Sequence, residues 1–252
     1  MDSVGYYNSF FFGGELNYGN ILSYLRYNEF DKIVEAKDIN EGLFKGKLGY
    51  HDTDVMHWYV KQLADHPQPF FSTLFTQSTH SPYDFPKMFE EIEWPVIEKQ
   101  YFNSAHYTDI AIKMFMEEAR QQPWYDSTLF IFVADHSHTS YKNHRMESFD
   151  HHKIPMLIYG EPLQDSLKGT TFDKICGNTD LPAMILAQLG LSHNEFIWSK
   201  DVFNLCYRPF AFFELNNGLG WKTPEGEFVY SNAGGFIKNT LPENISDSVT
   251  LD

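Results

Sequence analysis

The sequence has 252 residues, of which 42% are apolar and 17% aromatic, and it carries a formal net charge of −15. This composition excludes a disordered chain and allows a sizeable core, in one large domain or two small ones. The charges are mixed along the chain without a basic stripe, which argues against a nucleic-acid partner, because phosphate binding relies on clustered Lys and Arg. Two interpretations of the acidity are open: it can serve solubility alone, or it can belong to a site that collects divalent cations.

Strands and helices are predicted to alternate along the first half of the chain. An aromatic run at Tyr6–Phe12 predicts a buried strand, and Asp52–Ala64 has apolar residues at helical spacing. Phe70–Phe75 predicts a second strand, and a helix is expected from about His106 to Gln121. This alternation is typical of a mostly parallel sheet that helices cover on both faces.

The second half begins with the same pattern and then changes. Strands are predicted at Leu129–Ala134 and Pro155–Tyr159, and a helix at Leu181–Leu189, which Asn178–Asp180 precedes as a capping cluster. From Phe210 onward, short aromatic runs with turn signals predict an antiparallel hairpin or meander. We therefore expect an α/β domain over residues 1–207 and a C-terminal antiparallel extension of it over residues 208–252.

Neither a membrane span nor a signal peptide is visible in the sequence. The apolar stretches are strand-length, far below the roughly 20 residues that a spanning helix needs, so we expect a soluble chain. Cys176 and Cys206 belong to no CxxC pair, so a zinc cluster or redox motif is not indicated. The two cysteines can pair in an oxidising compartment or remain thiols, and an oligomer is compatible with the exposed strand edges we expect.

The predicted strand at Leu129–Ala134 ends in Asp135 and His136, with His138 two residues later. In parallel α/β sheets, ligands bind beyond the carboxyl ends of the strands. Asp135 and His136 can there reach one divalent cation through oxygen and nitrogen ligands, a set that suits Zn or Mn. The alternative is that Asp135 caps a helix and His136 packs.

The predicted strand at Phe70–Phe75 runs into a polar segment that contains His80. His80 would lie at the same rim as Asp135, where it can bind a phosphate or sulfate oxygen or protonate a leaving group. We expect His80, Asp135 and His136 to converge above the sheet. The alternative is a loop histidine with a local hydrogen bond.

Two further segments offer polar contacts for a ligand. The glycines at 13 and 14 allow a tight turn after the first strand, and Glu15 and Asn20 follow them as contacts for a polar head group. Before the strand at Pro155–Tyr159, His152 and Lys153 can reach an anionic group. The alternative for the glycine turn is a purely structural role, and the alternative for His152 and Lys153 is that their side chains are simply solvated.

Six segments together resemble the sulfatase and alkaline-phosphatase superfamily, and specifically the lipoteichoic acid synthase and phosphoglycerol transferase branch. In chain order they read FFFGGELNYGNILSYL, PFFSTLFTQSTHSPYDFP, STLFIFVADHSH, HKIPMLIYG, GNTDLPAMILAQLGL and WSKDVFN. The resemblance covers nearly the whole chain. It implies an alkaline-phosphatase-like α/β domain, with Mn or Mg as the usual metal and Zn in some relatives.

The resemblance also implies roles for individual residues. Asp135 and His136 match the family's paired metal ligands, and His80 matches the histidine that contacts the substrate phosphate. Glu15 falls near an acidic residue of the glycerol phosphate pocket, but Asn20 and Leu22 stand where that pocket carries a Trp and an Arg. The head-group preference is therefore open, and His138, His152 and Lys153 join the predicted substrate contacts.

The sequence departs from the family pattern at its start. The family's Thr nucleophile and one acidic metal ligand lie upstream of the Gly-Gly turn, whereas the first threonine here is Thr53, in a predicted helix start. We therefore expect a fragment of a transferase or sulfatase-like hydrolase, without its first strands, nucleophile or membrane helices, and with little turnover of its own. The alternative is an inactive binding domain for a lipid head group or glycan.

The resemblance implies where the parent protein acts. We expect it at the extracytoplasmic face of a bacterial membrane or in the periplasm, attached through an N-terminal region outside this sequence. The expected substrates are phospholipid head groups or cell-envelope glycans. A hydrolytic sulfatase remains a third interpretation, because the residue that distinguishes that branch lies in the region that this sequence does not contain.

Overall fold

A computed structural model of the chain describes residues 1–39, 42–139 and 144–240. The chain forms two compact units, each with its own sheets and helices. Unit 1 comprises Met1–Leu129 and Gly160–Pro162, and unit 2 comprises Phe130–Tyr159 and Leu163–Asp252. The domain boundary expected after residue 207 does not coincide with this division and stays a prediction.

Unit 1 is built on a parallel three-stranded sheet. The strands β1 (Tyr7–Phe12), β2 (Lys32–Val34) and β3 (Phe70–Phe75) lie in the order β2-β1-β3. Tyr7 pairs with Phe70 and Phe12 with Phe75, so β1 and β3 end at the same edge of the sheet. This shared edge brings the polar segments that follow the two strands together.

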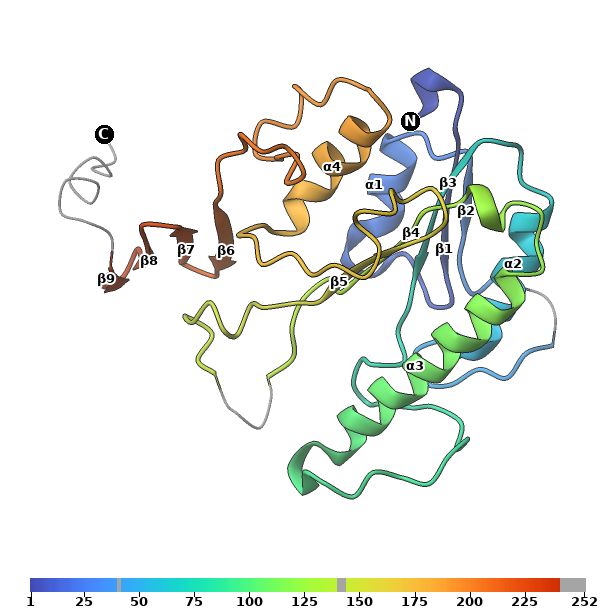
Figure 1. Cartoon of the computed structure of the whole chain (residues 1–252). Coiled ribbons are helices and arrows are strands. Elements are labelled where there is room, and N and C mark those ends of the chain that lie inside the picture. Colours follow the sequence, from blue (N-terminus) through green and yellow to red (C-terminus); the bar gives the residue numbers. More distant parts are fainter. Residues whose placement is uncertain (40–41, 140–143, 241–252) are drawn as a thin grey trace. The chain divides into compact units, whose positions relative to one another are not determined.

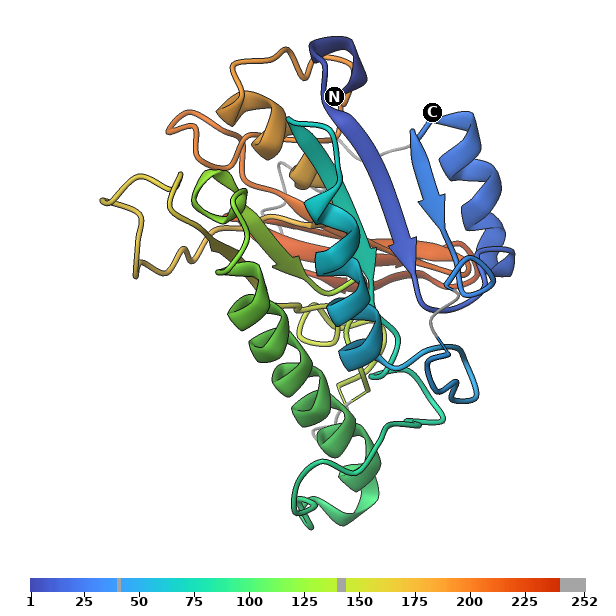
Figure 2. The same cartoon turned by 90° about the vertical axis from the view of Figure 1, so that its right-hand side faces the viewer.

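Three helices accompany this sheet. Helix α2 (Asp52–Ala64) lies against one side of it, and α1 (Ile21–Tyr27) lies on the opposite side (Figures 1 and 2). Helix α3 (Lys99–Ala119) packs on α2. The single-turn helices of the unit are η1 (Asp2–Val4), η2 (Tyr18–Asn20), η3 (Val96–Glu98) and η4 (Tyr125–Ser127).

The core of unit 1 forms where β1 meets α2. Phe11 is fully buried, and its ring lies 5.8 Å from that of Trp58 and 4.9 Å from that of Tyr59. Tyr59 stacks in turn against Phe115 of α3. Large aromatic rings in edge-to-face contact contribute burial and geometry together, so this cluster fixes how α2 packs on the sheet. The start of α2 is thereby fixed next to the strand ends.

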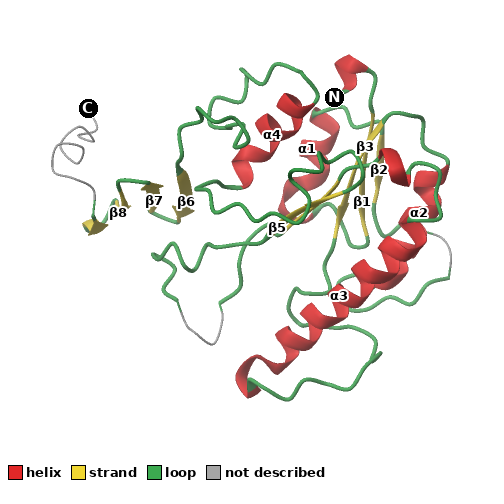
Figure 3. Ribbon diagram, viewed as in Figure 1, coloured by secondary structure: helices red, strands yellow, loops and turns green. Residues whose placement is uncertain are grey.

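Unit 2 begins with a two-stranded antiparallel sheet. The strands β4 (Phe130–Val133) and β5 (Met156–Tyr159) pair with Phe130 opposite Tyr159. Because the chain between them forms no helix in its described residues, it makes no crossover of the kind that parallel strands need. The segment from β5 to α4 (Leu181–Gln188) is mostly loop and includes η5 (Asn178–Asp180) (Figure 3).

An antiparallel meander follows in unit 2. Its strands lie in the order β6-β7-β8-β9. They are β6 (Ala211–Leu215), β7 (Gly218–Thr223), β8 (Gly226–Ser231) and β9 (Gly235–Asn239). The meander predicted from the turn signals after Phe210 is confirmed.

The predicted α/β fold class is also confirmed. Helix α2 matches its predicted range, whereas α3 begins seven residues before the position predicted from His106. The short elements β2 and α1 were not predicted. In the described part of the chain, no helix combines the length and apolar composition that crossing a bilayer requires.

Candidate functional site

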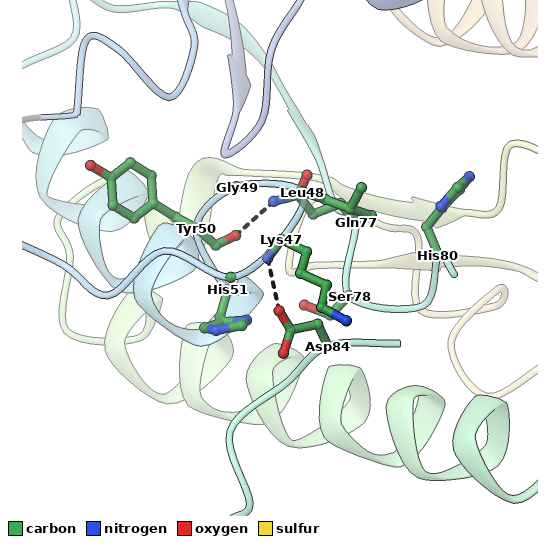
Figure 4. A pocket seen from close by; sticks show the side chains of 10 residues that line it. Lys47, Leu48, Gly49, Tyr50, His51, Gln77, Ser78, His80 and Asp84 are labelled. Carbon is green, nitrogen blue, oxygen red and sulfur yellow. Dashed lines mark hydrogen bonds between the residues drawn. The ribbon is translucent and has the colours of Figure 1, made fainter. Parts of the chain in front are cut away.

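Unit 1 has a small cleft beyond the ends of β1 and β3, where parallel sheets commonly bind ligands (Figure 4). Two segments form it: residues 46–51, which lead into α2, and residues 77–84, which follow β3. Its polar lining side chains are Lys47, His51, Gln77, Ser78, His80 and Asp84. His80 thus lies beyond the end of β3, and the rim that it was predicted to share with Asp135 stays a prediction.

Asp52, the first residue of α2, holds the segment after β3 in place. Its buried carboxylate accepts the backbone N–H groups of Gln77 and Ser78 at 3.0 and 3.1 Å and the Thr108 hydroxyl at 3.2 Å. Ser78 Oγ accepts the backbone N–H of Asp52 in return. Burial raises the pKa of Asp52, and these donors oppose the rise. The bonds fix the start of the turn that presents His80.

The exposed His80 ring is oriented by its own backbone. Nδ1 lies 2.6 Å from the carbonyl oxygen of Ser81, and because a carbonyl only accepts, Nδ1 carries a proton. In the neutral ring Nε2 is then a bare acceptor, and in the imidazolium it is a donor. His80 can therefore take up a proton and release it at Nε2, which suits contact with an oxyanion or a leaving alcohol.

The predicted Gly-Gly turn directly follows β1. A methyl group on Gly13 would lie 2.6 Å from Val55 Cγ2, and one on Gly14 would lie 2.7 Å from Gln77 Oε1, so the side chains packed around this turn leave little room for a larger residue. Glu15 and Asn20 are exposed in the segment that follows. Their contact with a head group stays a prediction.

In unit 2, Asp135 and His136 follow β4 as adjacent exposed side chains. His136 Nδ1 lies 2.7 Å from the Ser137 carbonyl oxygen, so Nδ1 carries the proton and neutral Nε2 keeps its lone pair. That nitrogen lies 3.6 Å from Asp135 Oδ2. Two ligands bound to one tetrahedral cation at about 2.1 Å would lie about 3.4 Å apart. The pair therefore fits a shared divalent cation.

The backbone contact of His136 strengthens that fit. Metal-binding histidines usually donate their other ring N–H to a carbonyl or carboxylate, which fixes the tautomer. Within the residues that the structure describes, no group of three or more His, Cys, Asp or Glu side chains could hold a metal ion. A metal site that used Asp135 and His136 would therefore need further ligands, and their metal binding stays a prediction.

Asn178 of η5 is a residue near this pair whose contact the sequence did not reveal. Its side-chain amide donates to the carbonyl oxygens of Ala134 and Asp135 at 3.2 and 3.0 Å. The buried carboxylate of Asp180 accepts the Gly177 backbone N–H and pairs with the Lys200 ammonium at 2.6 Å. The pattern Asn178-Thr179-Asp180 was predicted to cap a helix, and only the contacts reveal that Asn178 orders the segment of Asp135 and His136.

The remaining predicted contacts of unit 2 have partners of their own. Half-buried His152 stacks on Phe213 and donates from Nε2 to the Met146 carbonyl, and burial lowers its pKa. Exposed Lys153 pairs with Asp150 at 2.7 Å, and this hydrogen bond raises the lysine pKa. Their roles in substrate binding stay predictions.

The loop before β5 is tied to the segment after β4 by a hydrogen bond. Ser137 Oγ donates to the backbone carbonyl of His151, which brings the loop of His152 next to the segment of Asp135 and His136. The half-buried His138 follows in the same segment. Cys176 and Cys206 are free thiols, and burial raises the pKa of Cys176.

His80 belongs to unit 1, and Asp135 and His136 belong to unit 2. Their predicted convergence therefore stays a prediction. Within unit 1, sequence reasoning missed Lys47, His51, Asp52 and Asp84. For the three of these residues at 46–52, the sequence offered one signal: a glycine-rich turn that runs directly into a helix start containing Asp.

A family model described as Sulfatase matches residues 2–191. The chain belongs to the Sulfatase family. Lipoteichoic acid synthase 2 of Bacillus subtilis (strain 168) is 23% identical over 274 residues, which cover 99% of this chain and 41% of that protein. Lipoteichoic acid synthase of Staphylococcus saprophyticus is 26% identical over 208 residues, which cover 77% of this chain and 32% of that protein.

Solved structures agree with this membership. An alkaline phosphatase superfamily protein from Vibrio parahaemolyticus matches 98% of this chain and 63% of its own, with a TM-score of 0.81 and 28% identity. The lipoteichoic acid synthase LtaP from Listeria monocytogenes matches 97% of this chain and 67% of its own, with a TM-score of 0.76 and 17% identity. The predicted alkaline-phosphatase-like fold is confirmed, and the Sulfatase-family chain spans less than half the length of its synthase relatives.

Proposed function

We propose that this Sulfatase-family chain forms part of a metal-dependent enzyme that transfers a phosphoglycerol or related phospho-head-group. One observation carries the proposal: the lone pair of His136 Nε2 and the carboxylate of Asp135 lie 3.6 Å apart, with the tautomer fixed by Ser137. Similarity to lipoteichoic acid synthases supports the head group over a sulfate ester. Hydrolysis would be the same chemistry with water as acceptor.

The metal ligands in this proposal are Asp135 Oδ2 and His136 Nε2. A bound Mn²⁺, Mg²⁺ or Zn²⁺ would lower the pKa of an attacking hydroxyl and neutralise charge on the phosphoryl group. The protein's own contribution is orientation: Ser137 fixes the imidazole, and Asn178 fixes the backbone on which both ligands stand. The mixed carboxylate and imidazole set suits Mn²⁺ or Zn²⁺ better than Mg²⁺.

His80 would bind an oxygen of the phosphoryl group or return a proton to the leaving alcohol. As an imidazolium it donates from Nε2, while Nδ1 remains bonded to Ser81. Asp52 keeps the turn of His80 rigid, so this contact needs little ordering when substrate binds. Glu15, Asn20, His138, His152 and Lys153 are proposed as further contacts to the head group.

The attacking hydroxyl is proposed to come from the parent protein outside these 252 residues. The family pattern, in which the nucleophile precedes the Gly-Gly turn, supports this assignment. The same comparison with lipoteichoic acid synthases supports action at the outer face of a bacterial membrane, on lipid head groups or envelope glycans. An inactive binding domain would keep the cleft of His80 without needing the metal ligands.

Calorimetric titration of Mn²⁺ into the full parent protein tests the metal assignment. His136→Ala should abolish measurable binding, because the site loses its nitrogen ligand. His57→Ala is the matched control, because His57 lies on the exposed face of α2 and pairs with Glu118. Unchanged Mn²⁺ affinity in His136→Ala would refute the assignment and favour the inactive binding domain.

A further inference from the structure

His51 is a buried histidine whose ring lines the cleft of His80 (Figure 4). Only 5% of the residue is exposed. Within the described residues its imidazole makes no hydrogen bond, and it does not cap α2, although it occupies the N-cap position. Among the described residues, its ring nitrogens do not belong to the fully buried polar atoms that lack a partner, so they are open to the cleft.

The surroundings of His51 hold its ring toward the cleft. Phe44 stacks on it with 6.2 Å between ring centroids and an interplanar angle of 15°. Gly46 lies so close that a methyl group there would be 2.5 Å from His51 Cε1 and 3.1 Å from Nε2. The same methyl group would lie 2.7 Å from Asp84 Oδ2, so His51 and Asp84 face one common space.

The charges around this space favour an anion that also carries hydroxyl groups. Lys47 and His80 line the cleft together with His51, and the N-terminus of the 13-residue helix α2 begins at His51. Helix N-termini and cationic side chains stabilise anions, even in a protein of net charge −15. Asp84 uses Oδ2 to accept the backbone N–H of Lys47, which leaves Oδ1 for a hydroxyl.

We infer that His51 is a second imidazole contact for the substrate phosphate and donates from a ring nitrogen to a phosphate oxygen beside His80. The ligand class is a phosphate ester of a polyol, with Asp84 accepting a polyol hydroxyl. The inference rests on the proposed function, because it assumes that the His80 cleft receives the phospho-head-group. It assigns to His51 a binding role that neither the motifs nor the family comparison indicated.

The test is a titration of the full chain with inorganic phosphate and with glycerol phosphate, followed by ligand-detected NMR. His51→Ala should weaken the binding of both ligands by about tenfold to a hundredfold, the effect of losing a hydrogen bond to a charged group. His51→Gln, which keeps a donor, should lose less. His57→Ala, on the exposed face of the same helix, should bind as the unmodified chain does.

Imidazole resonances provide a readout that does not depend on the folding of a variant. In the unmodified chain, the His51 ring signals should shift on addition of phosphate and those of His57 should not. Unmoved His51 signals, or equal affinities with and without His51, would overturn the inference. A loss confined to glycerol phosphate would also overturn it, because His51 would then contact the polyol.

The His80→Ala variant separates the two proposals. If His80→Ala abolishes phosphate binding while His51→Ala does not, the role of His51 is wrong and the phosphate cleft stands. If neither variant changes phosphate binding, the proposed use of this cleft fails together with the role of His51.

Discussion

At the scale of single residues, a buried polar chain inside unit 1 links stability to pH. His66 Nδ1 donates to the Gln62 carbonyl at 2.7 Å, and its Nε2 lies 3.0 Å from the Ser9 hydroxyl oxygen. The Ser9 and Ser72 hydroxyls lie 2.7 Å apart, and Tyr59 donates to Ser72. Burial lowers the pKa of His66, with a further lowering by Lys32 that Asp65 opposes. Burial therefore favours the neutral ring, and the hydrogen bond to Gln62 only partly opposes it.

We predict that acid weakens unit 1 through His66. A histidine with a lowered folded-state pKa contributes fully above its unfolded value of about 6.5, and this contribution is lost as the pH falls through the folded pKa. Urea unfolding between pH 8 and pH 5 should show the free energy of unfolding falling toward pH 5. The fall should be smaller in His66→Gln, and an equal fall in both proteins would contradict the role of His66.

Asp52 is predicted to matter for stability as well as for the cleft. Asp52→Ala leaves the backbone N–H groups of Gln77 and Ser78 without their acceptor, which should cost about 2–4 kcal/mol of unfolding free energy. Asp54→Ala, in the same first turn of α2, should cost less than about 1 kcal/mol. Chemical denaturation measures both, and equal losses would show that Asp52 acts only through the helix dipole.

At the scale of elements, the single turn η5 is what orders the segment after β4. Asn178 donates to two carbonyls of that segment, and Asp180 is held by Lys200, whose ammonium also lies 3.5 Å above the centre of the Phe210 ring. Buried ion pairs depend on complete pairing, so this one fixes η5 firmly. The position of Asp135 and His136 thus depends on a helix start far from them in sequence.

We predict that Asn178→Ala lowers Mn²⁺ affinity of the parent protein by about tenfold to a hundredfold, which is typical when a group that orients a metal ligand is lost. Asn194→Ala, at an exposed position of unit 2, should leave the affinity unchanged. Calorimetric titration compares the two. Equal affinities would mean that Asp135 and His136 keep their orientation without η5.

Sequence patterns predicted some of the helices and strands and missed others. The dense aromatic and apolar runs of β1, β3 and β4 predicted those strands because burial dictates their composition. The three-residue strand β2 is too short for any periodicity, and α1 exposes Tyr24 and Tyr27, so its face carries no apolar stripe. The direction of β5 could not be predicted, because it depends on a connection that forms no helix in its described part.

At the scale of the whole molecule, the chain resembles its family in fold and in the order of its motifs. His80, Asp135 and His136 were predicted because chemistry-bearing side chains at strand ends form a local pattern. Asp52 and Asn178 were not predicted, because their hydrogen bonds join residues 25 to 56 positions apart, and His51 was not, because its burial is not visible in the sequence. The residues that hold a site in place are therefore found from tertiary contacts and not from sequence motifs.

The proposed function depends on Asp135 and His136 binding a divalent cation. Electron-nuclear double resonance of the Mn²⁺-loaded parent protein tests it directly. We predict a nitrogen coupling that changes on ¹⁵N-histidine labelling and disappears in His136→Ala. A spectrum of the unmodified protein with oxygen ligands alone, or an unchanged nitrogen coupling in His136→Ala, would contradict the claim.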